Sequence, residues 1–395
     1  MNIKALVPQW LKKVLWIPLV EAGGMKVLVY KYLFWLFKVH PHKIVMVNEV
    51  YDCNPKAILE EILRRGLNYE IVWLSDYDKS VFPEYVKVCH KTGWRGAYHL
   101  ATSKIIILNS KGDVIRFIKK KAQFQIQTLH GRCPFKLVEG EAIDKLPPLY
   151  LKRSMQDSLM TDLMLSDSKW TTDLYRKAFW FQGEIMEKGF PVNDIYYNAT
   201  QEFKDKLREI LGIEKGWKVI TYAPTFRDNG NMDCYGLDAP RLLKALKDKT
   251  GDRWTLLVRA HPNLQGKALP FDFSDDVRDV SMYPDVQHIF LVTDLLITDY
   301  SSVQMDNLLM NNPIILFVTD EEEYIAQRGI RHEYYEMPYP HCHNNDEVIE
   351  SVRALDFAHP FSPYVNEFLK LYGSAEDGHA SKCVVDRILE EAPLN

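Results

Sequence analysis

Short apolar runs alternate with amphipathic segments along most of this chain of 395 residues. From about residue 43, runs rich in Val, Ile and Leu are each followed by a segment of helical periodicity. This alternation is typical of right-handed βαβ units, which build a parallel sheet. Strands are expected over residues 43–50, 69–75, 86–89, 104–109, 124–129, 162–166, 218–223, 254–260, 277–279, 295–298 and 313–318. Helices are expected over residues 55–66, 96–103, 169–179, 201–211, 239–250, 283–292 and 304–311.

The alternation pauses over residues 190–199, where Pro191 and Asn193 indicate a linker, and then restarts. The length fits two domains, and an apolar content of 47% is ample for two cores. We therefore expect an α/β protein with two Rossmann-like domains built on parallel sheets, over residues 43–190 and 191–395. The terminal helix is expected to pack back, and a cleft is expected between the two sheets.

The first 42 residues differ in charge from the rest of the chain. Residues 1–43 carry seven lysines and one acid, Glu21, interleaved with Trp, Tyr and Phe, whereas the whole chain has a net charge of −4. The lysines recur too often for a membrane span of about 20 apolar residues, and no small-residue cleavage site follows. We expect amphipathic helices over residues 1–42 on an anionic cytoplasmic leaflet. The alternative is that this segment forms a helix pair packed on the first domain. Both interpretations hold if one face of a helix covers the first sheet and the other face contacts the membrane.

Charge and cysteine usage narrow the function classes further. A net charge of −4 argues against a nucleic-acid-binding protein. The six cysteines show no C-x-x-C spacing and no close pairing with histidine. They indicate reduced thiols, and no metal site is expected.

Polar and cationic residues follow four of the expected strands at the point where each strand ends. The carboxyl ends of strands in an α/β sheet, together with the helix N-termini beside them, are where anions bind. The pattern therefore predicts a site for a phosphorylated ligand. The candidates are His130 and Gly131 after residues 124–129, Thr225 and Arg227 after 218–223, Arg259 and His261 at the end of 254–260, and Thr298, Asp299, Ser301 and Ser302 at the end of 295–298.

Each candidate also has a structural alternative. Thr298, Ser301 and Ser302 could serve only as helix N-caps, and Asp299 could simply hold its loop. Arg227 and Arg259 could form ion pairs within the fold. A lone histidine is more often a structural residue than a catalytic one.

Six ordered motifs resemble the CDP-glycerol glycerophosphotransferase family of teichoic acid primases and polymerases. They are T-L-H-G-R-C-P-F-K (residues 128–136), Y-A-P-T-F-R-D (222–228), R-A-H-P (259–262), T-D-Y-S-S-V-Q-M-D (298–306), E-E-E-Y (321–324) and D-G-H-A-S (377–381). The resemblance implies a glycosyltransferase-B-like fold, with the acceptor facing the first domain and CDP-glycerol bound by the second. This chain departs from the family pattern after His130 and Gly131. The family motif resembles H-G-T-P-L-K, with one threonine between glycine and proline, whereas this chain has Arg132 and Cys133 in that place.

The resemblance also implies roles for the candidate residues. His130 is expected to take the proton of the acceptor hydroxyl, and His261 to act on the departing phosphate or to bind the diphosphate. Asp306 is expected to orient His261 or to contact the donor, and Glu322 to accept hydrogen bonds from ribose. The expected substrate-binding residues are Gly131, Thr225, Arg227, Arg259, Thr298, Asp299, Ser301, Ser302, Asp306, Glu322 and Ser381. No D-x-D pair ends a strand, so transfer is expected to need no cofactor or metal and to proceed in EDTA.

The implied function is transfer of glycerol phosphate from CDP-glycerol to a polyprenyl-diphosphate-linked glycan, with release of CMP. The enzyme is expected to be peripheral, on the cytoplasmic face of the cell membrane, and a primase is favoured over a long-chain polymerase. Two alternatives stay open. The same fold could use CDP-ribitol or a nucleotide sugar, or the protein could be a membrane-bound nucleotide-binding scaffold without turnover.

Overall fold

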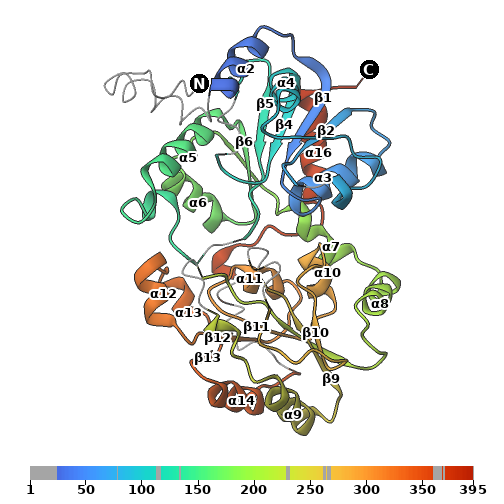
Figure 1. Cartoon of the computed structure of the whole chain (residues 1–395), viewed down its shortest axis with the longest axis vertical. Helices are drawn as coiled ribbons and strands as arrows, with labels where there is room; N and C mark the ends of the chain where they lie inside the picture. Colours follow the sequence, from blue (N-terminus) through green and yellow to red (C-terminus); the bar gives the residue numbers. More distant parts are fainter. Residues whose placement is uncertain are drawn as a thin grey trace, which may run out of the picture.

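The computed structural model describes residues 25–77, 79–112, 117–132, 135–227, 232–260, 264, 268–358, 367 and 370–394. His261 and residues 1–24 of the expected membrane-associating segment therefore lie outside the described residues. Two domains lie one above the other, and each is built on its own sheet (Figure 1).

The first sheet has seven parallel strands in the order β3-β2-β1-β4-β5-β6-β7. Helices cover both faces, so the central strands are apolar and buried along most of their length. The strand order reverses between β1 and β4, which is the topological switch point of this sheet. The strands are β1 (His40–Val47), β2 (Glu70–Leu74), β3 (Val88–Cys89), β4 (Ser103–Leu108), β5 (Phe124–Gln127), β6 (Leu163–Ser166) and β7 (Glu184–Glu187).

The helices around the first sheet include one from each end of the described chain. They are α2 (Met25–Trp35), α3 (Cys53–Arg64), α4 (Trp94–Thr102), α5 (Pro148–Met160), α6 (Lys169–Ala178) and α16 (Ala380–Glu391). Helix α16 places Val384, Val385 and Ile388 in the core beside α3. The last helix of the chain therefore belongs to the first domain, as Figure 1 shows in red beside β1 and β2.

Helix α2 packs on α4 through Phe34, which contacts Ala97 and Ala101. Among the described side chains of α2, those of Val29, Tyr32, Leu33 and Trp35 are exposed. Residues 25–35 thus pack on the first domain and still present apolar side chains to the outside. Within the described part of the chain, no helix is long and apolar enough to cross a membrane.

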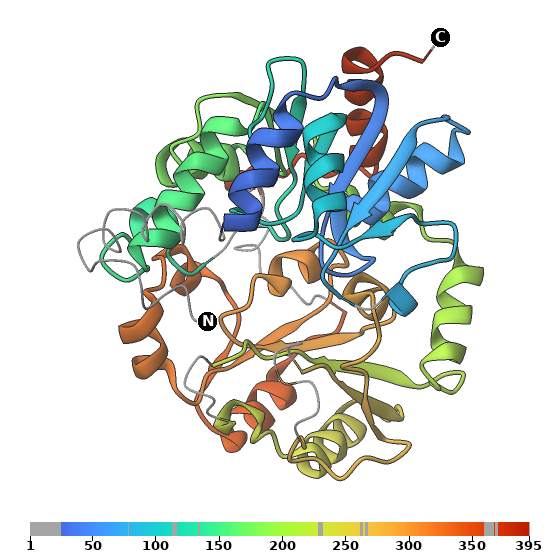
Figure 2. The same cartoon turned by 45° about the horizontal axis from the view of Figure 1, so that its top comes forward.

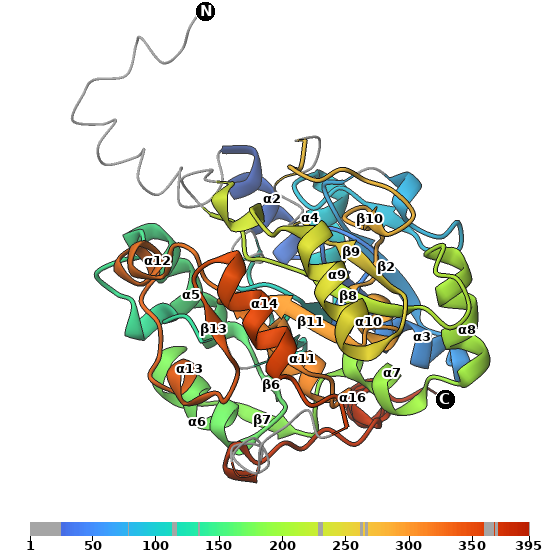
Figure 3. The same cartoon turned by 90° about the horizontal axis from the view of Figure 1, so that it is seen from below.

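The second sheet has six parallel strands in the order β10-β9-β8-β11-β12-β13, with its switch point between β8 and β11. The strands are β8 (Lys218–Tyr222), β9 (Trp254–Val258), β10 (Val277–Asp279), β11 (Leu295–Thr298), β12 (Ile314–Phe317) and β13 (His341–Cys342). The helices are α7 (Asp194–Asn198), α8 (Gln201–Ile210), α9 (Ala239–Thr250), α10 (Val286–Leu291), α11 (Val303–Leu308), α12 (Glu321–Arg328), α13 (Glu333–Glu336) and α14 (Asn345–Ala354). Figure 3 shows α9 and α14 side by side over one face of this sheet.

The predicted fold class is confirmed: two α/β domains with parallel sheets face each other in a glycosyltransferase-B-like arrangement (Figure 2). Several elements escaped the sequence prediction. Strand β13 has only two residues, and α12 begins with the three glutamates of the E-E-E-Y motif, for which no helix is expected from the sequence. Acids in a first turn stabilise a helix N-terminus, so the same residues favour a helix.

Candidate active site

A cavity of about 830 Å³ lies between the two domains. Its wall includes loops that follow β4 and β5 in the first sheet and β8, β9 and β11 in the second. These loops lie at the carboxyl ends of the strands, next to both topological switch points, where α/β sheets bind ligands. Six of the predicted site residues line it: His130, Gly131, Thr225, Arg259, Ser301 and Ser302.

The imidazole of His130 is held by the neighbouring strand. Its Nδ1 lies 2.9 Å from the backbone carbonyl oxygen of Asn109, which follows β4. A carbonyl only accepts, so Nδ1 donates, and in a neutral imidazole the lone pair is then on Nε2. Leu129, just before it, has a left-handed φ of 55°, and Asn54 Nδ2 donates to its carbonyl oxygen at 2.9 Å. The turn thus fixes an exposed imidazole whose free nitrogen can accept a proton.

Gly131 brings the two domains into close approach. A Cβ atom at this position would lie 3.3 Å from the hydroxyl oxygen of Ser302, which is tighter than ordinary van der Waals contact. Ser302 makes no capping hydrogen bond to α11, and the Ser301 hydroxyl accepts only a long one, 3.4 Å, from the backbone of Val303. Both hydroxyls therefore remain available to a ligand in the cavity.

Arg259 offers a guanidinium with unused donors. Its Nη1 donates to the carbonyl oxygens of Val280 and Tyr283, at 3.2 and 2.6 Å. Among the described residues it has no ion-pair partner within 4 Å. Burial lowers the pKa of Arg259, although Asp285 and Asp52 oppose this shift. A guanidinium that is partly desolvated and has no carboxylate in contact can bind a phosphate oxygen.

Thr298 and Asp299 hold the framework of the site. Both are fully buried. The Thr298 hydroxyl donates to the carbonyl oxygen of Ala223 at 2.7 Å. The Asp299 carboxylate accepts from the hydroxyl and the backbone N–H of Thr225, at 2.6 and 2.9 Å. These contacts favour the structural alternative for both residues, since their polar atoms are used within the fold.

Arg227 differs from its predicted role as a phosphate ligand. Its Nε and Nη2 donate to Asp320 at 2.5 and 2.9 Å, and its Nη1 donates to Asp299 at 2.8 Å. The guanidinium also lies 5.0 Å from the ring centres of Tyr300 and Tyr324, and the side chain is buried. Two carboxylates already neutralise this cation, so it stabilises the loops after β8, β11 and β12.

Arg132, which departs from the family motif, anchors one domain to the other. Its Nε donates to Asp167 at 2.6 Å, and neither side chain is exposed. Its Nη1 donates to the carbonyl oxygen of Met305 in α11 at 2.6 Å, and its Nη2 donates to Ser374 at 3.1 Å. One guanidinium therefore connects the loop of His130 to the helix that follows Ser302 and to the returning C-terminal segment.

Asp306 lies in the surroundings of Arg132 and does not line the cavity. Burial, opposed by Arg132 and assisted by Asp167, raises the pKa of Asp306 to about 7. Its predicted contact with the donor stays a prediction, and the buried side chain does not line the cavity wall. Its predicted partner His261 lies outside the described residues.

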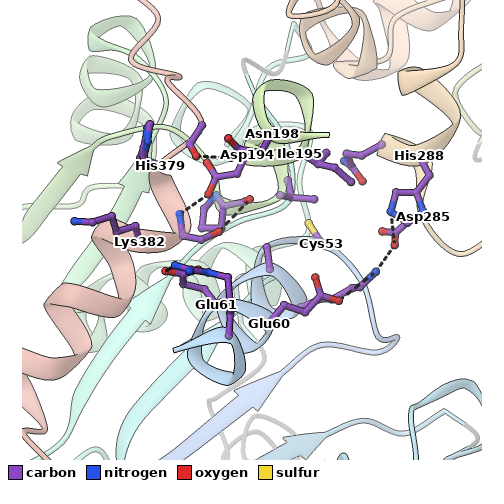
Figure 4. A pocket seen from close by; sticks show the side chains of 18 residues that line it. Cys53, Glu60, Glu61, Asp194, Ile195, Asn198, Asp285, His288, His379 and Lys382 are labelled. Carbon is purple, nitrogen blue, oxygen red and sulfur yellow. Dashed lines mark hydrogen bonds and ion pairs between the residues drawn. The ribbon is translucent and has the colours of Figure 1, made fainter. Parts of the chain in front are cut away.

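Ser381 lines a different cavity, of about 480 Å³, formed by α3, the linker, α10 and the start of α16. Figure 4 shows this cavity, with Asp194 hydrogen-bonded at the start of α16. Asp194 accepts from the backbone N–H groups of Ala380 and Ser381, at 2.9 and 2.7 Å. Ser381 is predicted to bind substrate at the start of α16, but the backbone N–H groups there already bind the Asp194 carboxylate. Glu322 is exposed on α12 and does not line either cavity.

Three residues of this region had no role in the sequence prediction: Lys111, Arg132 and Asp320. Lys111 follows the strand at residues 104–109, so the strand-end pattern that identified His130 could have found it. The partners of Arg132 and Asp320 are far away in sequence, and only the fold reveals them. Among the described residues, no group of three His, Cys, Asp or Glu side chains could hold a metal ion.

The CDP-Glycerol:Poly(glycerophosphate) glycerophosphotransferase family matches residues 30–390. The chain belongs to this family. It is thus an enzyme of the glycerophosphotransferase class, and the resemblance seen in its motifs is confirmed.

Curated relatives support the same assignment. The chain is 26% identical over 394 residues to the teichoic acid poly(glycerol phosphate) polymerase of Bacillus spizizenii, covering 94% of this chain and 98% of that protein. It is 26% identical to the teichoic acid glycerol-phosphate primase of Bacillus subtilis, over 90% of this chain and 94% of the primase. It is 29% identical to a teichoic acid poly(ribitol-phosphate) polymerase of Bacillus spizizenii, but covers only 59% of that protein.

A solved structure shares the fold over almost the whole chain. It is a variant of the wall teichoic acid polymerase TagF soaked with CDPG, and it is 25% identical with a TM-score of 0.81. The match covers 97% of this chain and 98% of that chain.

Replacing His130 by Ala is expected to lower the transfer rate by about 10²–10⁴-fold, the usual contribution of a general base. Binding of CDP-glycerol should stay nearly intact, because a general base acts on the acceptor hydroxyl and not on the donor. Calorimetric titration with CDP-glycerol and a CMP-release assay measure the two effects. His90→Ala is the control, since His90 is exposed and paired with Asp76 at the edge of the first domain. An equal collapse of donor binding would contradict the assignment.

Replacing Arg132 by Met should lower the free energy of unfolding by about 3–5 kcal/mol, because Asp167 would stay buried without its cation. Urea denaturation measures this change. Arg241→Met is the matched control, since Arg241 pairs with Asp346 on the exposed surface and its loss should barely change stability. If the two variants unfold alike, the buried anchor is not what holds the domains together.

Proposed function

We propose that this enzyme transfers glycerol phosphate from CDP-glycerol to a hydroxyl group of a lipid-linked glycan in teichoic acid or related polymer synthesis. One observation carries the proposal. Loops from both sheets bring a histidine, a guanidinium without a carboxylate partner and two unused hydroxyls to one cavity. A transferase that joins a nucleotide-activated donor to a separate acceptor needs such a cavity between two domains.

The proposed reaction forms one P–O bond and breaks another. The acceptor oxygen attacks the glycerol-bearing phosphorus, and the bond from that phosphorus to the bridging oxygen breaks, so that CMP leaves. His130 takes the hydroxyl proton at Nε2. Arg259 and the hydroxyls of Ser301 and Ser302 donate to the phosphoryl oxygens, where negative charge must be stabilised. His261 stays a proposed second catalytic group, on the strength of its motif alone.

We propose that the transfer needs no divalent metal. The described part of the cavity wall carries six arginines and lysines but a single acid, Glu139. Cationic side chains can stabilise phosphoryl oxygens in place of a metal ion. The reaction is therefore expected to continue in EDTA.

Product analysis tests the proposed function. The protein is incubated with a lipid-linked disaccharide and with CDP-glycerol, CDP-ribitol and UDP-sugars in turn, each with and without EDTA, and the products are identified by mass spectrometry. We expect glycerol phosphate on the acceptor, CMP in equal amount and little effect of EDTA. Short products of one or a few units would support a primase.

Other outcomes of this assay identify the alternatives. The similarity to a ribitol-phosphate polymerase keeps CDP-ribitol as the second candidate donor. Ribitol phosphate or a sugar on the acceptor would overturn the choice of donor. No CMP release with any acceptor would favour a nucleotide-binding scaffold without turnover.

We also propose that the enzyme is a peripheral protein of the cytoplasmic membrane face, bound through residues 1–42. Helix α2 supports this, because Phe34 packs on the domain while several of its described neighbours are exposed. The chain from α2 to Phe37 exposes Val29, Tyr32, Leu33, Trp35, Leu36 and Phe37. Apolar side chains of this kind, next to the lysines of the segment, suit the interface of an anionic bilayer.

Sedimentation with vesicles of phosphatidylglycerol and phosphatidylcholine tests this binding. A double variant, Leu33→Glu with Leu36→Glu, should bind roughly tenfold or more weakly, since each leucine side chain contributes about 1.5–3 kcal/mol when buried. Leu371→Glu is the control, because Leu371 is even more exposed than Leu33 and Leu36 but does not belong to residues 1–42. Unchanged pelleting of the double variant would contradict the proposal.

A further inference from the structure

Lys111 is a cation in the cavity wall to which the proposed reaction assigns no role. It lies just beyond the carboxyl end of β4, two residues after Asn109, whose carbonyl oxygen holds the imidazole of His130. Lys111 and His130 therefore come from adjacent strands at the same edge of the first sheet. Both side chains line the cavity between the domains.

The ammonium group of Lys111 has few partners. It donates to the hydroxyl of Ser158, which itself donates to the carbonyl oxygen of Phe179 at 2.7 Å. It also lies 4.6 Å from the centre of the Phe179 ring. No carboxylate of the described residues lies within ion-pair distance. An ammonium has three N–H donors, so two of those of Lys111 have no acceptor among the described residues and can bind a ligand.

The acids whose charges act on Lys111 already accept other hydrogen bonds. Asp157 accepts from the backbone N–H of Gly112 at 3.0 Å and from the side-chain amides of Gln125 and Gln127 at 3.1 and 3.0 Å. Glu139 accepts from the Tyr150 hydroxyl at 2.7 Å. Burial lowers the pKa of Lys111, and the charges of Asp157 and Glu139 only oppose that shift. A buried cation without a contacting anion is costly unless a ligand supplies one.

The position of Lys111 favours a ligand group other than the donor diphosphate. Arg259, Ser301 and Ser302 come from the second domain, whereas Lys111 comes from the first. Lys145 also lines the cavity from the first domain, but it donates to the carbonyl oxygens of Ile325 and Ala326 at 3.4 and 3.1 Å. A diphosphate held by the second domain therefore leaves the charge of Lys111 unaccounted for.

We propose that Lys111 binds a phosphate group of the acceptor, close to the hydroxyl that His130 deprotonates. This inference rests on the proposed function and adds to it that the acceptor is recognised as an anion. The phosphate could be a phosphodiester of a glycerol phosphate unit already present, or the diphosphate of the lipid carrier. The rings of Tyr150, Tyr175 and Phe179 line the cavity beside Lys111 and would contact the uncharged part of the same ligand.

Steady-state kinetics of Lys111→Met test the proposal, because methionine keeps the unbranched apolar stem, one atom shorter, and removes the charge. With a phosphate-bearing acceptor, KM for the acceptor should rise by about 10- to 100-fold, as expected for a lost charge-assisted hydrogen bond. KM for CDP-glycerol should change by less than about twofold. Lys111→Arg keeps the charge and should recover most of the acceptor affinity. Lys87→Met is the control, since Lys87 is exposed at the opposite edge of the sheet.

Two acceptors distinguish the sources of the phosphate. One is a disaccharide on a neutral lipid that ends in glycerol phosphate, and the other is the same disaccharide on a lipid diphosphate without glycerol phosphate. A KM effect confined to the first assigns Lys111 to the phosphodiester, and an effect confined to the second assigns it to the lipid diphosphate. Lys111→Gln takes the place of Lys111→Met if the latter does not fold.

Several results would overturn the inference. An equal rise of KM for CDP-glycerol would assign Lys111 to the donor, and an unchanged KM for both acceptors would leave it without a role in binding. In either case the wild-type enzyme would still transfer glycerol phosphate, so the proposed function would stand. If the wild-type protein transfers nothing to any acceptor, the proposed function and this inference fail together.

Discussion

The buried guanidinium of Arg132 determines how the two halves of the site meet. It follows His130 and Gly131 directly, and it donates to the carbonyl oxygen of Met305, three residues after Ser302. Asp167 neutralises it within the first domain, so the charge can be buried at the junction. Arg132 is therefore one of the contacts that set the separation between the imidazole and the two serine hydroxyls, beside the ion pairs of Lys56 with Asp285 and of Arg331 with Glu141. A rotation of one domain relative to the other would have to break the hydrogen bond from Arg132 to Met305, or the two residues would have to move together.

The fold could be predicted from the sequence because buried parallel strands have a strong signature. Runs such as residues 104–109 and 295–298 are apolar on both faces, since helices cover both sides of the sheet. The strand-end rule also located most of the cavity wall, because the carboxyl ends of parallel strands lie at one edge. The missed strands β7 and β13 are edge strands, short or flanked by glutamates, and their apolar signal is correspondingly weak.

The roles of individual side chains were harder to predict, because partners distant in sequence decide them. Arg227 was expected to bind phosphate, but Asp320, 93 residues away, neutralises it. Ser381 was expected to meet an anion, and the carboxylate of Asp194 takes that place. Lys111 and Arg259 differ from Arg227, since neither has a carboxylate within ion-pair distance among the described residues. A cation in a cavity wall is a binding candidate only after its possible partners have been accounted for.

The central claim is that a diphosphate binds between the two sheets, with the reacting phosphorus facing His130. A crystal structure of the His130→Ala protein with CDP-glycerol measures this directly. The account predicts the diphosphate beside Arg259, Ser301 and Ser302, with the glycerol directed toward Gly131. Nucleotide density in the smaller cavity between α3 and α16, with the larger cavity holding only solvent, would contradict it.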